Sequence, residues 1–494
     1  MESEPNTSPE AAHDLANARS AAARRWTSIV TDPRAAVGYK TKDGWVRSAK
    51  APANQEEHEQ LGIFHRDRLW IETVAIEPLN SWLSDLKAIP LVDATAVKEL
   101  GGYRKDDPCF CPEALGSKSV LRYVYGDGSG GPSAASRAAK TGWVLFDFSQ
   151  SAGFDLFGVI NSHERAASME LSPLHTFATT GFDLSPWDFG GFGTPRDPEK
   201  FGGFKEGEGG KGVTVVVSDS GMVSTLPLAA DVDVLSDVVP GTPTDYEDPY
   251  DSSAMDIGLD AGHGIFIAGI IRQLAPAATV VMSRVWSSNR TLVSEDDVLA
   301  DLATSMNTYP GKLILNWSLA SHPGDAPNRH FDDQVTDALE ERKNLIIVCA
   351  AGNDASERPE IRPSGMGHER MVSVGAVERS NGSGFRTATE FSNYGVLAKI
   401  WAVGKNIVAP FLPGTVHWTD ENGVPQTETF VGAAPPARWS GTSFAAPVVA
   451  GAAAIAFSGS ATATDAINIL LANTVDIDVR GTVKQGVPFV DSSI

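Results

Sequence analysis

A serine stands at the start of an apolar, alanine-rich stretch near the C-terminus. Residues 439–447 read Trp-Ser-Gly-Thr-Ser-Phe-Ala-Ala-Pro, so a glycine turn delivers Ser443 to the first turn of a predicted helix. Unpaired backbone N–H groups and the positive end of the helix dipole lie there, and both stabilise the negative charge that develops during acyl transfer. Pro447 is compatible with this helix because a proline near the first turn costs little hydrogen bonding. The pattern predicts a nucleophile, and an ordinary small-residue helix start is the alternative.

A serine hydroxyl is a weak nucleophile, so it needs a base and a carboxylate that orients the base. Among ten histidines, His263 stands out because it opens a second apolar helix, Gly-His-Gly-Ile-Phe-Ile-Ala-Gly-Ile-Ile. We expect the other nine to be surface or structural histidines. Upstream, residues 213–221 read Val-Thr-Val-Val-Val-Ser-Asp-Ser-Gly, which is typical of a central parallel strand. Asp219 then lies at the carboxyl edge of the sheet, where open α/β folds place their sites, or it caps the next turn.

A second buried-strand pattern leads to an asparagine. Residues 344–354 read Asn-Leu-Ile-Ile-Val-Cys-Ala-Ala-Gly-Asn-Asp, so the amide of Asn353 is expected at the same sheet edge as Asp219. There it can donate to an oxyanion together with the backbone N–H of Ser443. Glycine-asparagine is also a common turn pair. The motifs support one another because they occur in one chain, and together they predict acyl transfer.

From about residue 208 to the C-terminus the chain resembles the subtilases, the subtilisin-like serine peptidases. The resemblance rests on Asp-Ser-Gly, His-Gly, Ala-Ala-Gly-Asn and Gly-Thr-Ser-Phe-Ala-Ala-Pro. It implies that Asp219 is the triad acid, His263 the general base, Ser443 the nucleophile and Asn353 the oxyanion donor. The implied fold is α/β, a subtilisin-like parallel sheet with helices on both faces, preceded by a smaller β-containing N-terminal domain.

The resemblance also implies a strand that binds the substrate backbone. Residues 315–320 read Leu-Asn-Trp-Ser-Leu-Ala, similar to the family's Ser-Leu-Gly strand, which pairs with an extended peptide by β-augmentation. The implied substrate-binding residues are Ser318, Leu319, Ala320, Ala351 and Gly352. Ala320 and Ser321 stand where glycines are usual, so we expect a narrowed substrate site. Ile265 replaces a threonine and Val403 a proline, and neither change removes a catalytic group.

Composition divides the chain into four predicted parts. These are a polar N-terminal segment (1–60), an N-terminal β-containing domain (61–180), a Gly/Phe/Pro-rich linker (181–207) and the peptidase domain (208–494). Aromatic and β-branched runs at 120–125, 143–148 and 154–160 predict strands in the smaller domain. The peptidase domain contains two insertions. One separates Asp219 from His263 and includes residues 231–260, and the second, 415–438, predicts a flap over the substrate site.

Two roles are open for the N-terminal region. It is either a prodomain that blocks the site until a cut between residues 181 and 212 releases it, or a retained domain that senses or targets. The length of the region slightly favours the second role, and a hybrid of the two stays open. In both roles the N-terminal domain is a partner of the peptidase domain, as inhibitor or as sensor.

The charge balance limits the partners. A formal net charge of −22 argues against nucleic acid or an anionic membrane as the main partner. The resemblance to the subtilases implies a peptide or protein substrate. Nine acidic and no basic residues fall between residues 231 and 260. This stretch is a solvated surface, a rim for basic substrate residues or a calcium site. Because no ligand spacing matches a calcium loop, we expect no metal or cofactor, although structural calcium stays open.

The sequence favours a cytoplasmic setting. It shows no signal peptide and no run of 18 apolar residues, and it has only three cysteines. Of these, Cys349 falls inside a predicted buried strand, and Cys109 and Cys111 are too few for a zinc site.

The leading functional prediction is a serine endopeptidase with a narrow substrate range, which is a zymogen or is otherwise regulated. One variant is a dedicated maturation peptidase or transpeptidase, in which an amine intercepts the acyl-enzyme. A catalytically silent binding or scaffold protein is the alternative from another class. The related sedolisins, with a glutamate base, also use a Ser-Gly-Thr-Ser nucleophile, but His263 and the asparagine at position 353 argue against that assignment.

Overall fold

The structure of the chain is a computed structural model that describes most of the second half and part of the first. The described residues are 35–41, 44–47, 61–72, 89–90, 143–149, 151, 153–164, 171–179, 206–223, 232–234, 250–251, 256–257, 261–285, 293–321, 329–357, 361–379, 386–419, 425–433 and 435–490. The strand expected at 120–125 and most of the expected linker lie outside these residues.

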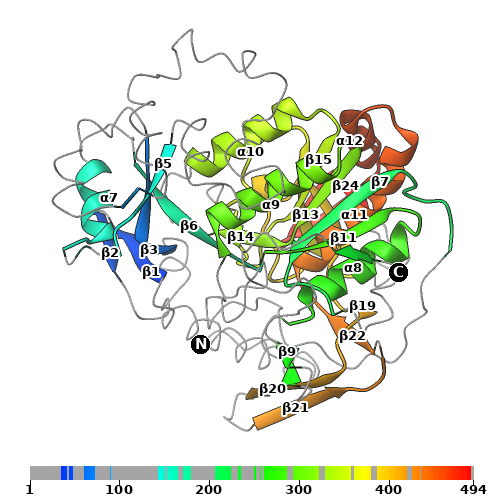
Figure 1. The fold of residues 1–494 in the computed structure, drawn as a ribbon. Helices are drawn as coiled ribbons and strands as arrows, with labels where there is room; N and C mark the ends of the chain where they lie inside the picture. The colour runs from blue at the N-terminus through cyan, green and yellow to red at the C-terminus, as the bar shows by residue number, and fades with distance from the viewer. Residues whose placement is uncertain are drawn as a thin grey trace.

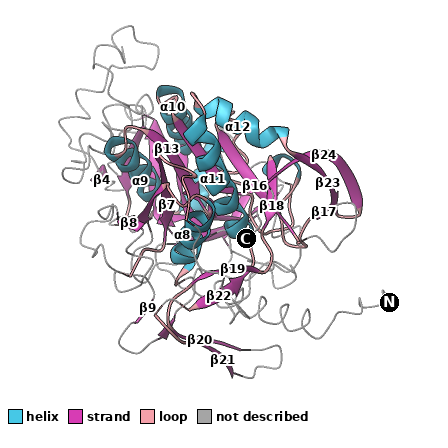
Figure 2. Ribbon diagram, turned by 90° about the vertical axis from the view of Figure 1, so that its right-hand side faces the viewer, coloured by secondary structure: helices cyan, strands magenta, loops and turns pink. Residues whose placement is uncertain are grey.

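A ten-stranded sheet forms the centre of the larger domain (Figure 2). In spatial order its strands are β17 (Arg386–Thr387), β23 (Thr474–Val479), β24 (Thr482–Val490), β18 (Ile400–Val403), β16 (Met371–Val377), β15 (Leu345–Ala350), β13 (Lys312–Trp317), β7 (Val213–Asp219), β11 (Thr279–Arg284) and β8 (Val232–Val234). All neighbouring pairs are parallel except β23 and β24. The sequence predicted this α/β sheet because its central strands are apolar runs with few polar positions, as strands buried on both faces require.

Helices cover both faces of the sheet. On one face α8 (His263–Leu274) and α11 (Thr442–Gly459) share an apolar cluster with the side chains of Val215 and Val217. On the other, α9 (Glu295–Thr308) and α10 (Arg329–Glu341) share a second cluster with Val216. Alternate residues of β7 therefore enter opposite cores, as the two-residue period of a strand demands. Helix α12 (Ala463–Ala472) packs against α11 and β24.

Among the described residues, α11 is the one helix long and apolar enough to cross a membrane by length and composition. It is 72% buried inside the protein, where it packs against α8 and the sheet strands β7, β13, β15, β16, β18 and β24. Its hydropathy is that of a helix at the centre of a core. Its position explains why alanine and glycine are frequent in it, since small residues let the helix approach the sheet closely.

The two insertions of the peptidase domain meet in a small sheet. Strands β9 (Tyr250–Asp251) and β10 (Asp256–Ile257), from the acidic stretch, join the hairpin β20 (Gly414–Thr419) and β21 (Pro425–Phe430). Beside it β19 (Ile407–Pro410) pairs with β22 (Pro436–Trp439). The expected flap is thus a hairpin continued by a strand that leads directly to the nucleophile motif.

The N-terminal region forms a second, antiparallel sheet at the left of Figure 1. Its strands are β1 (Ala35–Thr41), β2 (Gly44–Arg47), β3 (Leu61–Glu72), β4 (Ile89–Pro90), β5 (Trp143–Asp147) and β6 (Leu171–Thr179). Strand β5 lies where a strand was expected. Strands β1 and β2 fall within the segment assigned as polar, and β1 pairs along β3.

One predicted strand of this region is a helix. Residues 154–160 were expected to be extended, but α7 spans Leu156–Glu164. The side chain of Asp155 accepts a hydrogen bond from the backbone N–H of Gly158 at 3.2 Å, which caps the helix start. Leu156, Phe157 and Ile160 are buried, and their spacing fits one face of a helix. The prediction was wrong because a short apolar run does not distinguish the two periods.

Strand β6 leaves its own sheet and joins the larger domain. Its first part pairs with β3, and its end pairs antiparallel with both β12 (Val293–Ser294) and β14 (Leu319–Ser321). In Figure 1 it runs from the N-terminal elements toward β14. The N-terminal region therefore contacts the strand predicted to bind substrate.

Candidate active site

The structure brings Asp219 and His263 together. Asp219 ends β7 and His263 begins α8, and both side chains are completely buried. Nδ1 of His263 lies 2.9 Å from each carboxylate oxygen of Asp219. A carboxylate accepts from Nδ1–H, so this contact fixes the tautomer in which Nε2 is the basic nitrogen. The backbone N–H of Ser220 also donates to Asp219 Oδ1, at 2.8 Å, which helps to hold a buried negative charge.

Glycine next to His263 allows this close approach. A Cβ at Gly264 would lie 3.0 Å from the Cβ of Asp219 and 3.1 Å from its Oδ1. The backbone N–H of Gly264 instead donates to the hydroxyl of Ser220 at 3.0 Å. The imidazole also packs against the rings of Trp439 and Phe444, with ring centroids 5.7 and 5.3 Å away. These contacts place the histidine beside the helix that carries Ser443.

Ser443 is the second residue of α11, and Asn353 lies beside it. The side-chain oxygen of Asn353 accepts hydrogen bonds from the backbone N–H and the hydroxyl of Thr442, at 2.9 and 2.8 Å. The hydroxyl of Thr442 in turn accepts from the backbone N–H of Gly352 at 3.2 Å. Because its oxygen is occupied in this way, the amide of Asn353 must turn its NH₂ away from Thr442.

The NH₂ of Asn353 is buried and has no hydrogen-bond partner among the described residues. The residue is 1% exposed, so this donor cannot be satisfied by bulk water as a surface amide would be. A buried donor without a partner costs about 1–3 kcal/mol of stability. Proteins keep such a donor where a ligand or a reacting group supplies the acceptor during function.

The predicted substrate-binding residues flank Ser443 on two sides. Ser318 lies between β13 and β14, and its hydroxyl donates to the backbone carbonyl of Ser443 at 2.9 Å. Leu319 and Ala320 form the start of β14, which pairs with β6. On the other side Ala351 and Gly352 follow β15 and lead into Asn353. The sequence-predicted residues are thus gathered at the carboxyl edge of one sheet.

Comparisons with known proteins identify the family of the chain. The family model described as the subtilase family matches residues 210–485, more than half of the chain. The chain belongs to the subtilase family.

Relatives of this subtilase include the subtilisin-like protease 2 of Trichophyton tonsurans, which is 30% identical over 206 residues. That match covers 40% of this chain and 41% of the relative. The subtilisin-like protease 2 of Arthroderma benhamiae gives the same identity and coverage. The matched part therefore spans less than half the length of these curated relatives.

Two solved structures are similar to parts of the subtilase. A cold-adapted subtilisin-like serine proteinase is 22% identical and covers 60% of this chain and 95% of its own, with a TM-score of 0.42. Fervidolysin from Fervidobacterium pennivorans is 14% identical and covers 87% of this chain and 60% of its own, with a TM-score of 0.49.

A buried carboxylate behind the subtilase site was not found from the sequence. Asp301 of α9 is completely buried and accepts hydrogen bonds from the hydroxyls of Ser218 and Ser283. These serines are register partners on β7 and β11, and the next residue of β7 is Asp219. Burial raises the pKa of Asp301 to about 6, although both hydrogen bonds oppose the shift. The sequence did offer one sign of this residue. Asp301 is an acidic residue on the face of α9 that also carries Val298 and Ser305, which are buried.

Two further supporting residues were also missed. Thr442 orients the amide of Asn353, as described above. Asn393 accepts hydrogen bonds from the backbone N–H groups of Asp354 and Ser356, at 3.0 and 2.9 Å, and donates to the carbonyl of Ala351 at 2.9 Å. Gly352 has φ of +102°, and a Cβ there would lie 2.3 Å from the amide nitrogen of Asn393. The loop that carries Asn353 is therefore held in one conformation.

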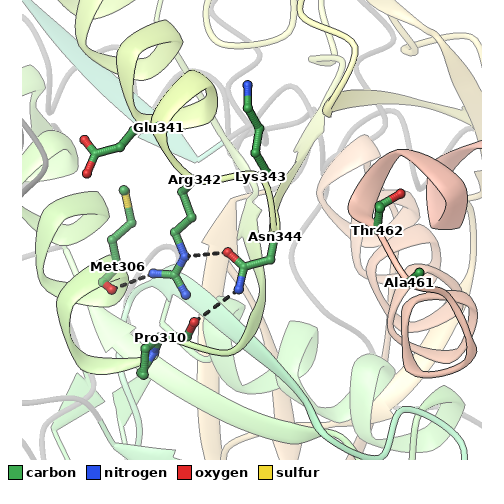
Figure 3. Close-up of a pocket in the computed structure, with 8 residues that line it drawn as sticks. All are labelled: Met306, Pro310, Glu341, Arg342, Lys343, Asn344, Ala461 and Thr462. Carbon is green, nitrogen blue, oxygen red and sulfur yellow. Dashed lines mark hydrogen bonds between the residues drawn. The ribbon is translucent and has the colours of Figure 1, made fainter. Parts of the chain in front are cut away.

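A pocket of the subtilase lies at the opposite end of the sheet (Figure 3). Its volume is about 440 Å³, and its lining residues are Met306, Pro310, Glu341, Arg342, Lys343, Asn344, Ala461 and Thr462. Pro310 and Asn344 precede β13 and β15, whereas the site follows these strands. In the described part of the chain no group of three or more His, Cys, Asp or Glu side chains is arranged to hold a metal ion.

Proposed function

We propose that this subtilase is a serine endopeptidase in which Asp219, His263 and Ser443 form the catalytic triad. The observation that carries the proposal is the buried contact of His263 Nδ1 with both oxygens of Asp219, beside the helix start that presents Ser443. A histidine held in this way has the tautomer and the counter-charge that a general base needs.

The chemistry follows from these positions. His263 Nε2 takes the proton of the Ser443 hydroxyl as the serine oxygen attacks a peptide carbonyl, and Asp219 stabilises the imidazolium that forms. The imidazolium then protonates the leaving amine. Water deprotonated by His263 hydrolyses the acyl-enzyme and regenerates the serine. The proposed reaction balances with no cofactor.

The oxyanion is assigned to two donors. One is the backbone N–H of Ser443 at the start of α11, and the other is the NH₂ of Asn353. The two hydrogen bonds from Thr442 hold the amide oxygen of Asn353, so its donor is oriented before the reaction. Preorganised donors of this kind stabilise developing charge without further rearrangement.

A second proposal concerns the N-terminal region. We infer that it inhibits the peptidase domain, with β6 in the place of a substrate strand. Strand β6 pairs with β14, the predicted substrate-binding strand, so a substrate and β6 compete for the same main-chain hydrogen bonds. This favours the inhibitory role over a purely targeting one. Release then requires a cut after β6, and residues 181–212 follow it.

Two experiments test these proposals. Purified chain and its Ser443→Ala variant are incubated with a casein substrate, and the proposal of a peptidase expects hydrolysis by the first alone. For the inhibitory role, new N-termini are sequenced over time. A cut in or next to residues 181–212, accompanied by rising activity, supports it, whereas full activity of the uncut chain contradicts it.

The alternatives make different predictions. A silent scaffold protein hydrolyses no peptide after the N-terminal region is removed. A maturation peptidase or transpeptidase cleaves one partner protein, and the transpeptidase forms an amide product when an amine is added. A sedolisin-like site has its maximum rate near about pH 4, whereas a histidine base requires higher activity at neutral to alkaline pH.

The remaining expectations on partners and setting stay proposals. We propose a peptide or protein substrate in a narrow range, no nucleic-acid or membrane partner, and a cytoplasmic location. Most of the acidic stretch at 231–260 lies outside the described residues, so structural calcium there stays a prediction. Chelation followed by a thermal melt checks it, because a structural calcium ion raises the melting temperature by binding the folded state.

A further inference from the structure

The end of strand β6 lies between two strands, β12 and β14. Phe177 lies opposite Val293 of β12 on one side and Ser321 of β14 on the other, and both neighbours are antiparallel to β6. An extended segment between two antiparallel strands uses the main-chain hydrogen bonds of both edges. Given the proposed function of the site, an extended substrate would align in this register of β6.

This register leads to the nucleophile. Thr179 pairs with Leu319, so a peptide that continues the register for one residue has that next residue opposite Ser318. Ser318 donates to the carbonyl of Ser443 at 2.9 Å, so a residue opposite Ser318 lies beside the nucleophile. It would be the acyl residue, the one whose carbonyl is attacked. In the chain's own sequence Thr179 is followed by Thr180 and Gly181.

Three connected segments lie beside Ser443 and would face the side chain of an acyl residue. Residues 318–320 form the strand wall and residues 351–353 form the loop wall on the other side of Ser443. Residues 361–364 join the two walls. The backbone N–H of Ser321 donates to the carbonyl of Arg362 at 2.8 Å, and the hydroxyl of Ser364 donates to the carbonyl of Ala351 at 3.3 Å.

The joining segment is held firmly. The guanidinium of Arg362 makes two hydrogen bonds to the carboxylate of Asp332 on α10, at 2.7 and 2.8 Å. Ile361 of this segment is 6% exposed and belongs to the same apolar cluster as Ala320 and Ala351 of the two walls. A large acyl side chain would have to displace Ile361, and close-packed interiors resist added volume.

We propose that the site accepts only small side chains at the acyl residue, namely glycine, alanine, serine and threonine. Ile361 determines this limit together with the methyl group of Ala320. The chain's own sequence at the corresponding position, Thr180, satisfies it. The substrate class is thus a peptide with a small residue before the cleaved bond, which narrows the proposed endopeptidase activity.

The test compares peptides that differ only at the acyl residue. We use Phe-Ala-Thr-X linked to a fluorogenic amine, with X as alanine, threonine, leucine or phenylalanine. The enzyme is the full chain carrying Ala178→Pro, which removes an N–H from the residue of β6 opposite Ala320 and loosens the inhibitory strand. We expect kcat/KM for alanine and threonine to exceed that for phenylalanine by about 100-fold or more, and Ile361→Gly to reduce this ratio at least about tenfold.

Ile467→Ala is the matched control. Ile467 on α12 is 2% exposed in the same apolar cluster, so its truncation destabilises the core without reaching the walls. It should leave the ratio unchanged. If Ile361→Gly does not fold, Ile361→Ala takes its place, with a smaller change in the same direction.

Each outcome decides the inference. A preference for small residues that Ile361→Gly relaxes and Ile467→Ala does not supports it. A preference for phenylalanine, or a ratio that Ile361→Gly leaves unchanged, overturns it while the peptidase proposal stands. Labelling by a fluorophosphonate is run in parallel, and a chain that remains unlabelled in the Ala178→Pro variant overturns the proposed function and this inference with it.

Discussion

The two edges of the large sheet hold polar groups in opposite ways. At the carboxyl edge the NH₂ of Asn353 is buried without a partner among the described residues. At the amino edge, in the pocket of Figure 3, Arg342 donates to the carbonyls of Met306, Tyr309 and Gly311 and to the side chain of Asn344. Its donors are used to join α9, α10 and the loop before β13.

This contrast shows that a surface pocket is not by itself evidence of an active site. The pocket at the amino edge is a place where loops are tied together by satisfied hydrogen bonds. The carboxyl edge carries the strained arrangement, because a buried donor and a buried carboxylate cost free energy unless function requires them. Substitutions at the two edges should therefore affect different quantities.

The largest expected effect comes from the nucleophile at the carboxyl edge. Ser443→Ala should lower kcat by about 10⁶-fold, the loss found for the corresponding serine of subtilisin, because no other group supplies the attacking oxygen. The melting temperature should change little. A fluorogenic peptide assay measures kcat, and a loss under about tenfold would show that the reaction does not use Ser443.

The oxyanion donor should give the next effect. Asn353→Ala should lower kcat by about 10²–10³, as loss of the equivalent donor does in subtilisin, with KM nearly unchanged. Thr442→Val keeps the amide and removes one of its two anchors, so a smaller loss of about tenfold is expected. Equal losses in kcat for the two variants would contradict the assignment of Asn353 as the donor.

The amino edge should respond in stability. Arg342→Ala leaves the carbonyls of Met306 and Tyr309 without this donor, together with the side-chain oxygen of Asn344. The carbonyl of Gly311 keeps a second donor, the side chain of Asn344. The free energy of unfolding should therefore fall by about 2–4 kcal/mol while kcat stays within about twofold. Glu341→Ala, at an exposed neighbour that lines the same pocket, is the control and should change stability by less than about 0.5 kcal/mol. Urea denaturation measures both, and a large loss of kcat in Arg342→Ala would remove the contrast between the edges.

The smallest effect is a pH dependence behind Asp219. The pKa of Asp301 is raised to about 6, so the folded state binds its proton more tightly than the unfolded state does. The stability linked to this proton is fully present below about pH 4 and is lost as the pH rises through about 6. Relative to Asp301→Asn, the wild type should lose about 2–3 kcal/mol over that range. A difference that is constant with pH would show that Asp301 does not titrate there.

The site was predictable from sequence because its motifs are local. Glycines flank His263, and Gly441 stands two residues before Ser443. Asp219 ends a buried strand and Asn353 follows another, so short strings encode both the residue type and its place at the sheet edge. The parallel sheet follows from the same strands. The short motifs do not reveal which polar atoms lack a hydrogen-bond partner. The supporting roles of Thr442 and Asn393 became clear only from the hydrogen bonds in the structure.

Long-range pairing was not predictable. Strands β6 and β14 lie about 140 residues apart in the sequence. The sequence of an apolar strand predicts which of its side chains share a face, but not which other strand it pairs with. Helix α7 was assigned as a strand because its apolar run is too short to separate the two periods, and the cap at Asp155 decides it. Asp301 was missed because its burial depends on two strands that α9 covers.

The most direct measurement is the site of fluorophosphonate labelling, located by peptide mass mapping of the chain after its N-terminal region is released. A general base held by a buried carboxylate should make a single serine reactive. We expect one adduct, on Ser443, and its loss in Asp219→Asn and His263→Ala, which remove the orienting carboxylate and the base. An adduct on another serine, or none on the released domain, would contradict the proposed triad.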